Sequence, residues 1–216
     1  MKKLAAITCA AAMSVLTAVS AFALGSTNLK DDDRVISLSP QAAQEVQEKT
    51  NLEAGENVAY LPAKESAEAV PNVDTENAEV TAFNEAFLQQ EATWTNAVAA
   101  LKLEDTTVSY EDENGQIVVF APKLEDLKPM SQPLVLYKQL PDGSFAPMAI
   151  EEPIELPLPT SEFLEGKKAE DLIVMILYMD GAVEFTPVTE TEGVLMATFP
   201  VTNGEHGPYE ATILSK

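Results

Sequence analysis

Side chains suited to catalysis or metal binding are sparse in this chain. His206 is its only histidine and Cys9 its only cysteine. The sequence contains no Gly-x-Ser-x-Gly elbow to carry a serine nucleophile, and no phosphate-cradling glycine loop. His206 precedes Gly207 in a glycine-containing stretch, which predicts a solvated loop histidine. A zinc centre needs several histidine or cysteine ligands, so none is expected.

Carboxylates are abundant, with 35 Asp and Glu residues, and a pair of them would suffice for a glycosidase. Glu151, Glu152 and Glu155, however, lie in a proline-rich stretch, and nothing in the sequence there raises a carboxyl pKa. Residues 31–33 are three adjacent aspartates, whose side chains point in different directions on an extended chain and indicate a solvated linker. We therefore predict no catalytic, cofactor-binding or metal-binding residue, and no cofactor.

Three further features have a chemical and a structural interpretation. Residues 112–115, Asp-Glu-Asn-Gly, resemble part of a calcium loop, but they lack its alternating ligands, and a hairpin turn explains them. Residues 156–160, Leu-Pro-Leu-Pro-Thr, resemble a sortase signal, but they are internal and have no hydrophobic tail after them. Trp94, the lone tryptophan, suits a sugar-stacking platform. Its alignment with Phe87 and Val98 at helical spacing favours a core position.

The N-terminus has the pattern of an export signal. Lys2 and Lys3 precede an almost uninterrupted apolar run over residues 4–24, and Ala21 and Ala23 supply the small residues that a signal peptidase requires. We expect cleavage after Ala23, with Ala21 as the alternative site; a permanent membrane anchor is the competing interpretation. Cleavage removes Cys9, so the mature chain has no disulfide, as expected of a protein secreted by a Gram-positive-type bacterium.

The chain is strongly acidic. Its formal net charge is −22 at pH 7, and removal of the two lysines of the signal segment, which has no acids, makes it −24. Such a charge repels nucleic acid and anionic membrane surfaces, so neither is an expected partner. The acidic residues are scattered, which favours solubility in an extracellular medium over attraction to cations, basic proteins or calcium.

After a flexible lead over residues 24–34, residues 35–103 are predicted to form a mostly helical segment with short strands. Ser39 and Pro40 have the pattern of an N-cap and a first helical residue. The second and clearest helix is expected over 77–103, where large apolar residues recur at helical spacing: Val80, Phe83, Phe87, Trp94, Val98 and Leu101. The other elements expected are strands at 35–38 and 57–61, the first helix at 41–51, and a loop at 62–76.

From residue 104 to 216 the pattern changes to about eight short strands separated by turn signals. The run 172–179 is apolar at consecutive positions, which predicts a central strand buried on both faces, with helix 77–103 covering one of them. The segment containing Ile154 and Leu156 is punctuated by prolines, which predicts an edge strand or an extended loop. The predicted fold class is α+β: an N-terminal helical segment packed on a mainly antiparallel, Ig-like β-sandwich.

Residues 172–214 contain a strand followed by Tyr-Met-Asp-Gly at 178–181, then Val183, Phe185 and, near the end, Pro208-Tyr209. This stretch resembles a C-terminal β-sandwich module of secreted proteins from gut Firmicutes. The resemblance rests on turn and core residues, so it implies a fold and an extracellular setting but no activity.

These observations favour a secreted, non-catalytic binding or structural accessory protein, whose partner is an unidentified extracellular protein or glycan. Two alternatives remain open: an extracellular hydrolase that uses paired carboxylates, and a calcium-dependent adhesion module.

Overall fold

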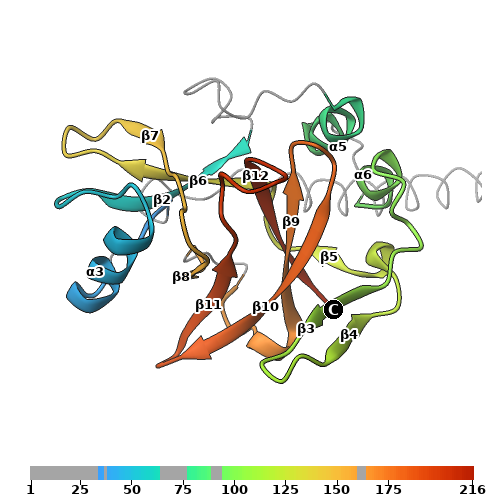
Figure 1. Ribbon diagram of the computed structural model, residues 1–216. Helices are drawn as coiled ribbons and strands as arrows, with labels where there is room; N and C mark the ends of the chain where they lie inside the picture. Colours follow the sequence, from blue (N-terminus) through green and yellow to red (C-terminus); the bar gives the residue numbers. More distant parts are fainter. Residues whose placement is uncertain (1–33, 37, 64–76, 89–93, 160–163) are drawn as a thin grey trace, which may run out of the picture.

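A computed structural model describes residues 34–36, 38–63, 77–88, 94–159 and 164–216. The predicted signal peptide with Cys9, the lead, the aspartates at 31–33, most of the predicted loop 62–76 and the end of the 156–160 motif lie outside these ranges. Within them the protein has three α-helices and a mainly antiparallel sheet that curls until it nearly closes into a barrel-like structure (Figure 1).

The helices precede most of the strands in the chain. They are α3 (Pro40–Lys49), α5 (Ala78–Leu88) and α6 (Trp94–Ala100). The strands of the first half are β1 (Val35–Ile36), β2 (Asn57–Pro62), β3 (Val108–Glu111), β4 (Ile117–Ala121), β5 (Lys128–Pro129) and β6 (Leu134–Gln139). Those of the second half are β7 (Phe145–Pro147), β8 (Ile154–Pro157), β9 (Leu172–Tyr178), β10 (Val183–Thr191), β11 (Val194–Phe199) and β12 (Tyr209–Ser215).

One sheet accounts for most of the strands. Its order is β1-β2-β6-β12-β9-β10-β11-β8, with β7 also paired to β6 and β5 to β12, while β3 and β4 form a separate hairpin. The nine-residue strand β10 pairs with β9 along its first half and with β11 along its second, so the sheet continues around the curve. The structure thus shows the predicted α+β class, but not the predicted Ig-like sandwich. The predicted edge position of the Ile154–Leu156 segment is confirmed, because β8 ends the sheet.

The central strand β9 is buried on both faces, as predicted. Leu172, Val174, Ile176 and Tyr178 belong to the cluster inside the curved sheet, and the alternate residues Ile173, Met175 and Leu177 belong to the cluster outside it. Burying an aliphatic side chain of this size contributes about 1.5–3 kcal/mol relative to leaving it exposed. The strand is therefore a principal link between the two cores.

The outer core contains the predicted apolar stripe, but on two helices. α5 ends at Leu88 and α6 begins at Trp94, with residues 89–93 outside the described ranges, so the structure does not show the single helix expected over 77–103. Phe83, Phe87 and Trp94 pack edge to face, with ring centroids 5.0–6.2 Å apart. Trp94 is only 6% exposed, and its indole N–H donates to the Leu124 carbonyl at 2.9 Å. The core position predicted for Trp94 is confirmed.

Helix α3 begins as predicted, and the residues that follow it contact the segment after β7. The Ser39 hydroxyl accepts a hydrogen bond from the Ala42 N–H at 3.2 Å, and Pro40 occupies the first helical position. The helix buries Val46 in the inner core. After it, Thr50 pairs with Ile150 in an isolated antiparallel bridge, which ties the helix to the segment that follows β7.

Candidate functional site

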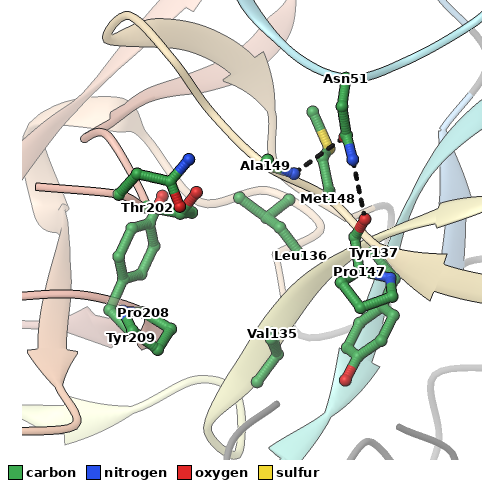
Figure 2. A pocket seen from close by; sticks show the side chains of 11 residues that line it. Asn51, Val135, Leu136, Tyr137, Pro147, Met148, Ala149, Thr202, Pro208 and Tyr209 are labelled. Atoms are coloured by element: carbon green, nitrogen blue, oxygen red, sulfur yellow. Dashed lines mark hydrogen bonds between the residues drawn. The ribbon is translucent and has the colours of Figure 1, made fainter.

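The sheet splits where β6 and β12 separate, and the split holds a cavity of about 330 Å³. β6 pairs with β12 only at Leu134, opposite Ala211, and with β7 only from Tyr137 onward. Figure 2 shows the residues that line this cavity, with the rings of Tyr137 and Tyr209 on opposite sides of the view. The cavity is lined by Asn51, Val135, Leu136, Tyr137, Pro147, Met148, Ala149, Thr202, Asn203, Pro208 and Tyr209.

One wall is the segment after β7, which Asn51 holds in place. The Asn51 amide donates to the Pro147 carbonyl at 3.3 Å and accepts from the Ala149 N–H at 2.9 Å (Figure 2). The backbone N–H of Asn51 also donates to the Ala149 carbonyl at 3.0 Å. With its side-chain amide committed to the backbone, Asn51 serves mainly to shape the wall.

The facing wall is the connection between β11 and β12. Thr202 joins it to the first wall: its N–H donates to the Ile150 carbonyl at 3.0 Å, and its hydroxyl accepts from the Ile150 N–H at 2.9 Å. The Tyr209 hydroxyl donates to the Pro200 carbonyl at 2.9 Å. Hydrogen bonds between protein groups hold both walls in place, so the cavity is preformed.

The lining determines which ligands the cavity can accept. Of its eleven described residues none carries a charge, and most are apolar. A charged ligand group would find no ionic partner among these residues, and any loss of its hydration would be uncompensated. The Thr202 hydroxyl still has its own proton to donate, and Asn203 is exposed at the rim. The site therefore favours a small, uncharged ligand with an apolar body and some hydrogen-bonding groups.

A second group of polar side chains lies beside this wall. His206 Nδ1 and Asp180 Oδ2 are 2.8 Å apart, and the His206 ring lies 5.1 Å from that of Tyr178, which contacts Tyr209 in turn. The hydrogen bond to Asp180 raises the pKa of His206. The Ala182 N–H and His206 together lower the pKa of Asp180. His206 lies in an exposed loop, as predicted, but the turn after β9 gives it a carboxylate partner that sequence spacing did not reveal.

Sequence reasoning also missed a buried acid, Glu210 on β12. It is 1% exposed, and the Asn84 amide of α5 donates to its Oε2 at 3.0 Å. Three nearby buried oxygens, Glu210 Oε1, Asn84 Oδ1 and Thr212 Oγ1, have no hydrogen-bond partner. Burial raises the pKa of Glu210 to about 8. The sequence signal for this buried acid was that Glu210 is the only charged residue of β12, whose other residues are apolar or small.

The carboxylates considered from the sequence lie elsewhere. Glu151, Glu152 and Glu155 are exposed, and none lines the cavity; Glu155 accepts a hydrogen bond from the Thr189 hydroxyl at 2.7 Å. Asp112 accepts from the N–H groups of Asn114 and Gln116, which confirms the hairpin-turn interpretation of residues 112–115. Among the described residues, no group of three His, Cys, Asp or Glu side chains is placed to hold a metal ion.

Comparison with known proteins does not extend these observations: no family model matches the chain, and no curated protein or solved structure is significantly similar to it. In the part of the chain that the structure describes, no helix is long and apolar enough to cross a membrane.

Proposed function

We propose that this is an exported, non-catalytic binding protein that holds a small, uncharged ligand in the split between β6 and β12. The observation that carries the proposal is the preformed cavity, whose described lining residues carry no charge. Its volume equals that of about 11 water molecules, so a ligand of about a dozen non-hydrogen atoms fits. Many peptides and sugars found outside the cell contain neutral groups of this size. Such ligands would be accessible to a protein with the export signal predicted at the N-terminus.

Binding in the cavity is tested with small probes of matched size. We expect the purified protein to bind glucose or N-acetyl-L-leucine amide in saturation-transfer NMR. N-acetyl-L-leucine, which carries a carboxylate in place of the terminal amide, should bind about tenfold more weakly or not at all, because its charge would be desolvated without a partner.

A pair of variants locates the binding. Ala149→Phe fills the cavity and should abolish the signal, whereas Ala99→Phe adds the same ring on the exposed face of α6 and should retain it. Val135→Phe fills the cavity from the opposite side and should agree with Ala149→Phe. The proposal is refuted if neither neutral probe binds, or if both cavity-filling variants, folded by circular dichroism, bind as the wild type does.

Export is tested separately. We expect the protein recovered from culture medium to begin at Leu24, or at Phe22 if the alternative site is used, because small residues precede both positions. N-terminal sequencing measures this directly. Protein that begins at Met1 and stays in the membrane fraction would instead show a permanent anchor.

A further inference from the structure

The buried acid Glu210 lies at the interface between the sheet and α5. Along β12, Ala211 belongs to the inner core and Leu214 to the outer one. Because successive side chains of a strand alternate between its faces, Glu210 and Thr212 also point to the outer side. The Asn84 amide of α5 donates to Glu210 Oε2 at 3.0 Å, so α5 covers this part of the sheet.

The polar atoms at this interface have more acceptors than donors. Glu210 Oε1, Asn84 Oδ1 and Thr212 Oγ1 are buried oxygens without a hydrogen-bond partner. Of these three atoms, only the Thr212 hydroxyl carries a proton while Glu210 is ionised, and protonation of Glu210 adds a second donor. A buried carboxylate that lacks donors is costly, so the closed interface favours the protonated acid.

The charged and titratable side chains on the elements packed around Glu210 do not change this preference. They are Glu79 and Glu85 on α5, Tyr178 on β9, Tyr137 and Lys138 on β6, and Lys128 on β5. Glu79 pairs with Lys102, Lys138 pairs with Glu56, and Glu85 and Lys128 are exposed. Burial raises the pKa of Glu210, the Asn84 hydrogen bond opposes this effect, and no charged side chain of the described residues contributes.

The two sides of the interface differ in how firmly they are held. β12 pairs with β9 along its whole length and with β6 and β5 on its other side, so it cannot move without opening the sheet. α5 has 11 residues, and an isolated helix of that length is marginal in water. It therefore depends on the packing of Val80, Phe83 and Phe87 in the outer core. Displacement of α5 brings water to Glu210 at a lower cost than unfolding of the sheet does.

We propose that α5 is a pH-dependent cover over the outer face of the sheet, which loosens when Glu210 loses its proton. In the open form the Glu210 carboxylate regains its hydration, and the neighbouring outer side chains of β9, Met175 and Leu177, become accessible. Opening becomes easier as pH rises from about 4.5, the ordinary pKa of this carboxyl, to about 8, its pKa under the closed cover. The inference does not depend on the proposed binding function, because Tyr209, which lines the cavity, points to the opposite face of β12.

Amide hydrogen exchange of the purified protein, followed by NMR between pH 5 and pH 8, tests the cover. After correction for intrinsic exchange rates, the opening constants of the Phe83 and Phe87 amides should rise roughly 300-fold from pH 5 to pH 8. Glu210→Gln should make these constants independent of pH, and Glu210→Met, a second neutral variant, should do the same. Glu85→Gln, at an exposed position of α5, is the matched control and should keep the wild-type rise.

Low concentrations of urea separate opening of α5 from unfolding of the whole protein, because the effect of urea scales with the surface that becomes exposed. At pH 8 the α5 amides should have larger opening constants and a smaller urea dependence than the Val174 and Ile176 amides of β9. Equal constants and equal urea dependence would show that α5 opens only with the whole protein, and the cover is then wrong. A rise with pH that persists in both Glu210 variants would assign the effect to another group and would also overturn the inference.

Discussion

Glu210→Gln is expected to remove a loss of stability that the wild-type protein undergoes as pH rises from about 5 to 8. The Glu210 carboxyl is buried on the outer side of β12 against α5, with a pKa of about 8 compared with its ordinary value of 4.5. Burial is the cause, because the ionised form has lost its hydration and has one hydrogen bond, from Asn84. The folded state therefore holds a proton that the unfolded chain releases.

The sign of the effect follows from this difference in proton binding. A raised carboxyl pKa in the folded state gives the greatest stability below about pH 4.5, a decline between pH 4.5 and pH 8, and no further change above pH 8. Between pH 5 and pH 8 the free energy of unfolding should fall by about 3 to 4 kcal/mol on account of this group. Protonated Glu210 can also donate a hydrogen bond, and acceptors without a partner lie close by on Asn84 and Thr212.

Other carboxylates act in the opposite sense, so the prediction concerns a difference between proteins. Asp180, whose pKa is lowered, stabilises the protein above its unfolded pKa, and that contribution is lost as pH falls. Urea unfolding of wild type and Glu210→Gln at several pH values isolates the Glu210 contribution, since glutamine is neutral throughout. Glu190→Gln, on the exposed part of β10, is the matched control and should leave the wild-type profile unchanged. Parallel stability profiles for wild type and Glu210→Gln would contradict the prediction.

Trp94→Ala should lower the free energy of unfolding by about 3 to 5 kcal/mol, as expected for removal of a large core aromatic. The substitution leaves a void beside Phe83 and Phe87 and deprives the buried Leu124 carbonyl of its donor. Since Trp94 is the only tryptophan, unfolding has to be followed by far-UV circular dichroism rather than by tryptophan fluorescence.

One further variant separates the contribution of the Trp94 ring from that of its N–H donor, and a second serves as a control. Trp94→Phe keeps an aromatic ring and removes the N–H donor, so it should retain more of the stability than Trp94→Ala does. Val194→Ala, at the exposed first residue of β11, is the control and should change the free energy of unfolding by less than about 0.5 kcal/mol. A loss below about 1 kcal/mol for Trp94→Ala would show that its ring does not support the outer core.

Much of the local structure follows from the sequence because it depends on short-range patterns. The apolar run of β9 and its stop at Asp180-Gly181 predict the strand and its two-sided burial, and both are found. The Ser39-Pro40 pair predicts the start of α3 for the same reason. The single helix expected over 77–103 is not shown, because an apolar stripe at helical spacing can continue across two helices.

The overall shape of the sheet was not predictable in the same way. Sandwiches and barrel-like sheets use similar strands and turns, and they differ in whether long strands bend from one set of neighbours to the next. Here β10 does so, pairing first with β9 and then with β11. Pro187 and the shift of the apolar residues from Val183 and Phe185 to Val188 mark the place of the change, but these features suit the end of a strand as well as a bend.

The candidate site lay outside the reach of motif searching. Its lining comes from four segments of the chain, at Asn51, 135–137, 147–149 and 202–209, and no local motif joins them. The pairing of β6 with β12 ends at Leu134 and Ala211, and the place where it ends is a property of the strand register. The His206–Asp180 contact likewise spans 26 positions.

The two-sided burial of β9 has a consequence for the order in which the chain can fold. The strands that flank it in the sheet, β10 and β12, both follow it in the sequence, so a nascent chain that has only reached Tyr178 exposes seven consecutive apolar residues without a partner for either edge. Such a segment is prone to intermolecular pairing. Acidic residues stand at both ends, Glu170 and Asp171 before it and Asp180 after it, where mutual repulsion opposes the stacking of copies. We therefore expect these carboxylates to oppose aggregation of the chain until β10 and β12 have been made.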